Sequence, residues 1–168
     1  MTRGVAEDVY ISAGSNIEPV KNLRMACREL EQKFGSLSMS SVYQSAPVGF
    51  DGDDFLNVVI SFATTQSIGA ITVELERLHD LAGRFRSANS LSSRALDLDM
   101  LLYGTQIIDV PPVSLPRDDV TRYAFVLAPM AELAPTLRHP VTGETMQDLW
   151  RRFDRAKQPI QLLAESPL

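Results

Sequence analysis

The stretch Arg94-Ala-Leu-Asp-Leu-Asp-Met-Leu-Leu-Tyr-Gly104 alternates apolar and acidic residues, which predicts a β-strand with one buried face. Its apolar side chains fall at every second position, as Leu96, Leu98, Met100 and Leu102. Successive side chains of a strand point to opposite faces, so Asp97 and Asp99 should project together on the other face. Aspartate is disfavoured in strands, and two of them in an otherwise apolar strand therefore indicate a specific role.

The segments before this strand follow the order strand, helix, strand, strand, helix. Alternation, helical periodicity and capping residues predict strands at 9–13, 38–43 and 55–64, and helices at 19–34 and 68–82. With the aspartate-bearing strand added, this is the order of the ferredoxin-like, split-βαβ α+β fold. It predicts a four-stranded antiparallel sheet with helices packed on one face. A short strand within 105–110 and helices near 128–133 and 146–153 would complete a single domain over 1–168, with its core at about 8–155.

Composition limits the classes of function. The chain has 168 residues, of which 45% are hydrophobic and 22% charged, as in a globular domain with a real core. Its net charge of -5, without a long basic run, argues against a nucleic-acid partner. No apolar stretch reaches the roughly 20 residues of a membrane span, and the first residues do not resemble a signal peptide. The single cysteine, Cys27, suits a reducing compartment. We expect a cytoplasmic protein that is a monomer or a weak homodimer.

The aspartate pair suggests a metal site. Two neighbouring carboxylates repel each other unless a cation lies between them, and Mg²⁺ prefers such oxygen ligands. Arg84, Arg86 and Arg94 lie just upstream, and guanidinium groups suit the phosphate chain of a nucleotide on that metal. From the residues alone, a solvated strand face that happens to carry Asp97 and Asp99 is an equally good interpretation.

Six segments, in one order along the chain, carry a resemblance to a known family. They are Gly14-Ser-Asn16, Tyr43-Gln-Ser-Ala-Pro-Val-Gly49, Phe55-Leu-Asn57, Gly83-Arg84-x-Arg86, Arg94–Gly104 and Phe125-Val-Leu-Ala-Pro-Met-Ala-Glu-Leu-Ala-Pro135. Together they resemble 6-hydroxymethyl-7,8-dihydropterin pyrophosphokinase over about 8–155. The family transfers pyrophosphate from ATP to the hydroxymethyl group of the pterin and releases AMP in folate biosynthesis. The resemblance implies the same reaction here, with ATP and a hydroxymethyl pterin as the small-molecule partners.

The resemblance also implies a role for each matching residue. Asp97 and Asp99 would hold two Mg²⁺ ions between the ATP phosphates and the pterin hydroxyl. The expected catalytic residues are Arg84, Arg86, Arg94, Asp97 and Asp99. The expected ATP-binding residues are Arg84, Arg86, Arg94, Met100, Ser114, Arg117 and Arg122. The expected pterin-binding residues are Ser45, Ala46, Val48, Phe55, Asn57 and Phe125, with the two phenylalanines on either side of the flat ring.

The chain departs from the family pattern mainly in the segments expected to handle phosphate. Ser90-Leu-Ser-Ser-Arg94 stands where the family usually has Arg-Trp-Gly-Pro-Arg, and His79 stands where it has glutamate. Arg117-Asp118 replaces His-Tyr, Tyr123 occupies the usual arginine position, and Ala46 replaces a proline. Two alternatives to a working enzyme therefore stay open. One is a paralogue with altered or lost activity that binds a pterin or a nucleotide, and the other is an interaction domain of the same fold.

Overall fold

The computed structural model describes residues 4–83 and 95–168. In this part of the chain an antiparallel sheet has the strand order β5-β1-β4-β3-β8, and β2 pairs with β4. In chain order the elements are β1 (Glu7–Ser15), α1 (Pro19–Phe34), β2 (Ser38–Met39), β3 (Tyr43–Ser45), β4 (Phe55–Thr64), α2 (Ile68–Leu81), β5 (Asp97–Tyr103), β6 (Ile108–Val110), β7 (Val113–Leu115), α3 (Asp119–Arg122), α4 (Ala124–Leu133), α5 (Met146–Arg151), η1 (Arg155–Lys157) and β8 (Ile160–Leu162). The predicted ferredoxin-like order of strands and helices up to β5 is confirmed, with the second strand divided into β2 and β3. The predicted count of four strands is wrong, because this division and the addition of β8 give a six-stranded sheet in the described part of the chain.

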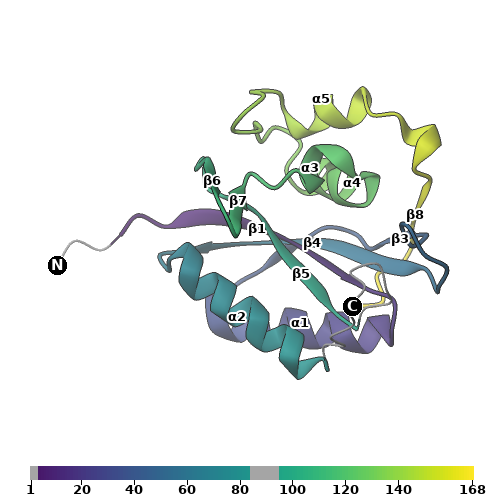
Figure 1. Cartoon of the computed structure of the whole chain (residues 1–168), viewed down its shortest axis with the longest axis horizontal. Helices are drawn as coiled ribbons and strands as arrows, with labels where there is room; N and C mark the ends of the chain where they lie inside the picture. The colour runs from purple at the N-terminus through teal and green to yellow at the C-terminus, as the bar shows by residue number, and fades with distance from the viewer. Residues whose placement is uncertain (1–3, 84–94) are drawn as a thin grey trace.

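Helices cover both faces of the sheet, where the sequence predicted one. Figure 1 shows α1 and α2 below the sheet and α3, α4 and α5 above it. The reason lies in β4, whose consecutive residues Val58, Val59 and Ile60 are all fully buried. Since neighbours in a strand face opposite ways, an unbroken apolar run requires cover on both sides. The third and fourth predicted helices, α4 and α5, supply the second layer.

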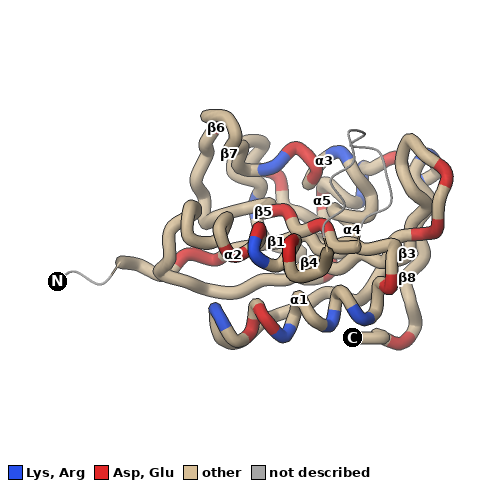
Figure 2. The backbone as a smooth tube through the Cα atoms, turned by 60° about the horizontal axis from the view of Figure 1, so that its bottom comes forward, with Lys and Arg blue, Asp and Glu red and all other residues tan. Residues whose placement is uncertain are grey.

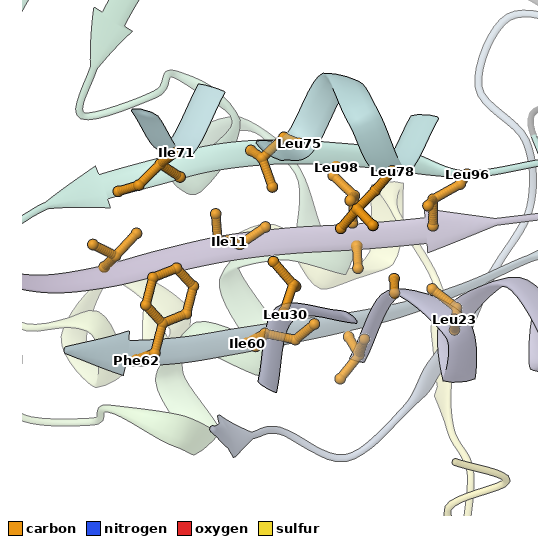
Figure 3. Packing of buried hydrophobic residues seen from close by; sticks show 14 of the residues in the cluster. Ile11, Leu23, Leu30, Ile60, Phe62, Ile71, Leu75, Leu78, Leu96 and Leu98 are labelled. Carbon is orange, nitrogen blue, oxygen red and sulfur yellow. The ribbon is translucent and has the colours of Figure 1, made fainter. Parts of the chain in front are cut away.

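The larger core lies between the sheet and the first two helices. Figure 3 shows side chains of α2 meeting Ile11 of β1 and Leu98 of β5, and side chains of α1 lying over Ile60 of β4. Ser67 begins α2 as predicted, because its hydroxyl accepts a hydrogen bond from the Ala70 amide at 3.1 Å. This core holds the face of β5 that points toward α1 and α2, and the opposite face of the strand is left for other contacts.

A β-bulge in β5 corrects the predicted alternation. Tyr10 of β1 pairs with Leu102, whereas Ile11 pairs with Met100, so Leu101 has no partner across the ladder. The extra residue reverses the faces beyond it. Leu102 therefore packs with Leu101 in the upper core, and the prediction that it shares a face with Leu98 is wrong. The bulge comes after the aspartates, so their shared face is kept.

Two smaller features complete the described fold. The strand expected within 105–110 is β6, which forms a separate hairpin with β7. The last strand, β8, pairs with β3 and extends the sheet beyond residue 155. Over residues 4–83 and 95–168, no helix is both long enough and apolar enough to cross a membrane.

Candidate active site

A cleft of about 220 Å³ lies over the sheet on the side of α3 and α4. Parts of β1, β4 and β5 form its floor. The loop between β3 and β4 forms one wall, and residues 117–125 form the other. The cleft therefore collects side chains from five separate parts of the sequence.

One row of paired residues crosses the floor. Gly14 of β1 pairs with Asp97 on one side and with Asn57 on the other. Paired residues of a sheet point to the same face, so the carboxylate and the carboxamide both face the cleft. Their strands are two inter-strand spacings apart, roughly 10 Å. Because Gly14 carries no side chain, the floor between the two polar groups is open.

The acidic part of the cleft contains one described arginine. Arg117 Nη2 lies 3.6 Å from Asp99 Oδ1, and Arg117 Nε lies 3.1 Å from Asp119 Oδ2. Burial lowers the pKa of the guanidinium, but the charges of Asp99, Asp119 and Asp97 outweigh it and raise the pKa above its usual value. Figure 2 shows the alternation of basic and acidic positions around α3. Arg117 is thus a permanent cation beside the aspartate pair.

The contact between Arg117 and Asp119 is an ion pair without an aligned hydrogen bond. Arg117 Nε is buried and finds no hydrogen-bond partner among the described residues, although the carboxylate is close enough for charge attraction. Unmet donors of this kind are uncommon in proteins and suggest that another group completes the site. An anionic oxygen entering the cleft would satisfy it.

Asn57 is oriented by its neighbours on β3. Its Nδ2 donates to Ser45 Oγ at 2.8 Å and to the Tyr43 carbonyl oxygen at 3.2 Å. The carbonyl can only accept, which assigns nitrogen to that side of the carboxamide. Both donor hydrogens are used inside the protein, so Asn57 offers the cleft its Oδ1 acceptor. An asparagine side chain carries both donors and an acceptor, and in this structure only the acceptor is left for a ligand.

Aromatic rings line the walls. Phe50 meets Phe55 edge to face, with ring centroids 6.3 Å apart. On the other wall, Tyr123 stacks on Phe125 at 5.1 Å with an angle of 17° between the rings. Stacked and edge-to-face geometries are the favourable ones for aromatic pairs. The cleft thus combines flat apolar walls with a few oriented polar groups, as small-molecule sites usually do.

The structure brings most of the predicted residues that it describes to this cleft. Those that line it are Ser45, Ala46, Val48, Phe55, Asn57, Asp97, Asp99, Arg117 and Phe125. Arg84, Arg86 and Arg94 lie outside the described residues. Their roles and those of the lining residues stay predictions.

Three predicted ATP-binding residues do not line the cleft. Met100 packs against the lower core, because strand alternation places it with Leu98. Ser114 is exposed in the β6–β7 hairpin. The guanidinium of Arg122 lies over the Tyr123 ring, 5.4 Å from its centroid.

Several lining residues were not predicted from the sequence, including Ser12, Phe50, Asp119 and Tyr123. Two of them had a usable signal. Phe50 is a large aromatic in a loop rich in glycine and aspartate, where little local packing is expected. Tyr123 sits in the arginine position of the family pattern, two residues before Phe125. Asp119 had no local signal, since its place beside Arg117 and the cleft depends on the path of the chain after β7.

Comparisons with known proteins identify a family that the chain resembles over most of its length. A sequence profile of the family described as 7,8-dihydro-6-hydroxymethylpterin-pyrophosphokinase (HPPK) matches residues 10–135. The chain is 34% identical, over 148 residues, to the 2-amino-4-hydroxy-6-hydroxymethyldihydropteridine pyrophosphokinase of Haemophilus influenzae, covering 86% of this chain and 91% of that protein. Against the protein of the same name from Pseudomonas aeruginosa it is also 34% identical, over 143 residues, covering 79% of this chain and 83% of that protein.

A structural comparison extends the likeness to a much larger protein. The crystal structure of Plasmodium falciparum HPPK-DHPS with pteroate has a TM-score of 0.74 and 13% identity, covering 94% of this chain. The chain spans only 44% of that protein, and at this identity the likeness concerns the fold. The family profile and the two bacterial relatives carry the assignment, and on their strength the chain belongs to the HPPK family.

Proposed function

We propose that this cleft performs the reaction of its family, the transfer of pyrophosphate from ATP to 6-hydroxymethyl-7,8-dihydropterin with release of AMP. The observation that carries the proposal is the row Asp97–Gly14–Asn57. The row has a carboxylate at one end and a hydrogen-bond acceptor at the other, and this supports a phosphate side and a pterin side on one open floor. The two substrates can then meet over Gly14.

Asp97 and Asp99 fit a magnesium site. They supply oxygen ligands from one strand face, and both line the cleft. No group of three or more His, Cys, Asp or Glu side chains that could hold a metal occurs within 4–83 and 95–168. Two carboxylates suffice here because Mg²⁺ usually keeps waters and takes substrate phosphates as its remaining ligands. When bound, the metal neutralises charge on the phosphates. We propose two ions, as in the family pattern.

Arg117 is suited to the phosphate chain of ATP. Its Nε is buried without a hydrogen-bond partner among the described residues, and its guanidinium already lies beside Asp99. A guanidinium can hold two phosphate oxygens at once in a fixed geometry. The family pattern has histidine at this position, so the chain places a stronger, permanent charge there. Arg84, Arg86 and Arg94 keep their proposed roles on the phosphates.

The pterin ring fits the aromatic and polar side of the cleft. Phe55 and Phe125 come from opposite walls and can contact the two faces of a flat ring. Asn57 Oδ1 can accept a hydrogen bond from an N–H at the ring edge. Ser45 holds the Asn57 carboxamide in place at 2.8 Å. Ala46 and Val48 add apolar surface on the same side.

The reaction needs no protein nucleophile. The hydroxymethyl oxygen of the pterin attacks the β-phosphorus of ATP, the bond from that phosphorus to the bridging oxygen of AMP breaks, and the hydroxyl proton is released. Phosphoryl-type transfer depends mainly on alignment and on stabilisation of charge. The residues of this cleft supply both, because Asn57 and the phenylalanines orient the alcohol while Arg117 and the aspartates face the phosphates.

An AMP-release assay with ATP, Mg²⁺ and the reduced hydroxymethyl pterin tests the proposal. We expect the wild type to form one AMP per pterin consumed. Asp99→Ala should lose turnover by about 10²-fold or more, because a group that stabilises the transition state is removed. It should stay folded, since the Asp99 side chain is 27% exposed and belongs to neither core. Asp109→Ala, on exposed β6, is the matched control and should keep full activity.

Two results would contradict the proposal. Near-normal turnover of the folded Asp99→Ala variant would remove the metal role of the aspartates. A wild type that binds the pterin but forms no AMP would instead be a pterin-binding protein. Light scattering tests the expectation of a monomer or weak homodimer. A titration of Mg²⁺ in the presence of a non-cleavable ATP analogue tests the expectation of two ions.

A further inference from the structure

His79 contacts the strand that carries the aspartates. It lies in the last turn of α2, with only 6% of its surface exposed. Its Nε2 accepts a hydrogen bond from the backbone N–H of Leu98 at 2.9 Å, and its Nδ1 lies 3.3 Å from Glu76 Oε1. The backbone donor requires a lone pair on Nε2, which assigns the ring proton to Nδ1 and lets it donate to the carboxylate. Both nitrogens are therefore committed, and the ring is held in one orientation.

The contact falls between the two aspartates. Leu98 separates Asp97 from Asp99, and β5 is the edge strand of the sheet in the described part of the chain. In an antiparallel pair, residues on one strand alternate between bonding inward to the partner and pointing outward. Leu98 directs its N–H outward, where an edge strand would otherwise have no partner, and His79 supplies the acceptor. The flanking aspartates project upward into the cleft from the same short segment.

The contact also joins two layers. The histidine belongs to α2, which lies in the lower helical layer (Figure 1), whereas the aspartate side chains line the cleft on the opposite face of the sheet. A rotation or outward movement of β5 at Leu98 would turn both carboxylates together. The hydrogen bond that the Leu98 amide donates to His79 opposes this movement at the one residue between the two aspartates.

We infer that His79 is a positioning residue, whose hydrogen bond to the Leu98 amide fixes the direction of Asp97 and Asp99 toward the metal. This inference rests on the proposed function. The family pattern has glutamate at position 79, and in this chain a histidine at that position supplies the acceptor. Groups that orient metal ligands in this way typically change metal affinity by about 10–100-fold when they are removed. The same magnitude is expected here.

Two substitutions separate the hydrogen bond from the packing of the ring. His79→Phe keeps a ring of similar size and removes the acceptor. His79→Gln removes the ring and places a carboxamide oxygen near the position of Nε2. The probe is Mn²⁺, titrated by spin resonance with α,β-methylene-ATP present, in which the bond to be cleaved is blocked. Amide exchange of Leu98 reports the hydrogen bond directly, and thermal melting reports folding. Ile71→Val, a mild core change on the same helix, is the control for lost stability.

We expect His79→Phe to bind Mn²⁺ about 10–100-fold more weakly, with faster exchange of the Leu98 amide and a lower kcat. Its KM for the pterin should stay unchanged, because Asn57 and Ser45 lie two strands away or more. His79→Gln should remain close to the wild type in Mn²⁺ affinity. Ile71→Val should melt earlier without weakening Mn²⁺ binding.

The inference is overturned if His79→Phe binds Mn²⁺ as tightly as the wild type. It is equally overturned if His79→Gln, with a protected Leu98 amide, binds as weakly as His79→Phe, since packing of the ring would then be decisive. Failure of the proposed function gives a different result: the wild type itself would neither bind Mn²⁺ with the nucleotide analogue nor release AMP.

Discussion

Replacing Arg117 with methionine should make the aspartate pair a tighter cation site and a poorer nucleotide site. The guanidinium lies 3.6 Å from Asp99 Oδ1 and 3.1 Å from Asp119 Oδ2. A metal held by Asp99 would share that carboxylate with the arginine charge, and we take a separation of about 5 Å between the two charges. The arginine either stays and repels the ion, or moves away and gives up both ion pairs. Both responses weaken binding of a metal without nucleotide.

The size of the effect follows from Coulomb's law. The Arg117 side chain is 41% exposed, and the dielectric constant of water gives the smallest value of the repulsion for such a half-buried group. A single charge and a double charge about 5 Å apart then repel by about 1.7 kcal/mol. Salt at physiological strength reduces this to about 1 kcal/mol. Arg117→Met should therefore bind Mn²⁺ alone roughly 5–20-fold more tightly, with the larger gain at low salt.

The nucleotide responds in the opposite direction. Without Arg117 the phosphate chain loses a cation, so kcat/KM for ATP should fall by about 10²–10³-fold if the contact acts mainly in the transition state. Spin resonance of Mn²⁺ without nucleotide and the AMP-release assay measure the two effects. Arg151→Met is the matched control, because it removes the same charge from a side chain of α5 that is 70% exposed. Unchanged or weaker Mn²⁺ binding by folded Arg117→Met would refute the reasoning.

Two further predictions concern other parts of the chain. Gly14→Ala should raise KM for the pterin more than KM for ATP, because the added Cβ would lie 3.2 Å from Asn57 Oδ1 on the cleft floor. Gly69→Ala is the control, since its Cβ meets nothing closer than 3.9 Å. An unchanged KM for the pterin in Gly14→Ala would mean that the ring binds elsewhere. Burial, followed by the charge of Glu31, raises the pKa of the Cys27 thiol to about 11. The neutral thiol therefore predominates below that pH, and at pH 8.5 only about 0.3% of Cys27 in the folded protein is thiolate. Alkylation of Cys27 at this pH should be about 100-fold slower in the folded protein than in the protein unfolded in urea. Mass spectrometry measures the two rates. Equal rates in the two conditions would contradict the burial of Cys27.

Local sequence was sufficient for the longer elements up to β5 and for their order, but it did not indicate β7, α3 or β8, which are only three or four residues long. The bounds of β4 follow from a segment rich in β-branched and aromatic residues, and α2 begins after Ser67 because a hydroxyl at that position caps a helix. The alternation around Asp97 and Asp99 is enough by itself to place both side chains on one face of the strand. These features depend on residues a few positions apart, where period, capping and turn chemistry operate.

The tertiary structure decided which distant residues meet. The bulge at Leu101, the cover on both sheet faces and the row Asp97–Gly14–Asn57 all depend on strand register, which is set by hydrogen bonds between segments far apart in sequence. His79 illustrates the difference. In the sequence it is a polar residue beside an apolar helical stripe, which suggests a boundary position. In the fold it is buried and accepts a hydrogen bond from the Leu98 amide, because the packing of α2 against β5 brings residue 79 to the outer edge of β5 at Leu98. The sequence by itself determined the chemistry available to this protein, whereas only the fold decided which of those groups face one cleft, since that depends on register and packing between elements.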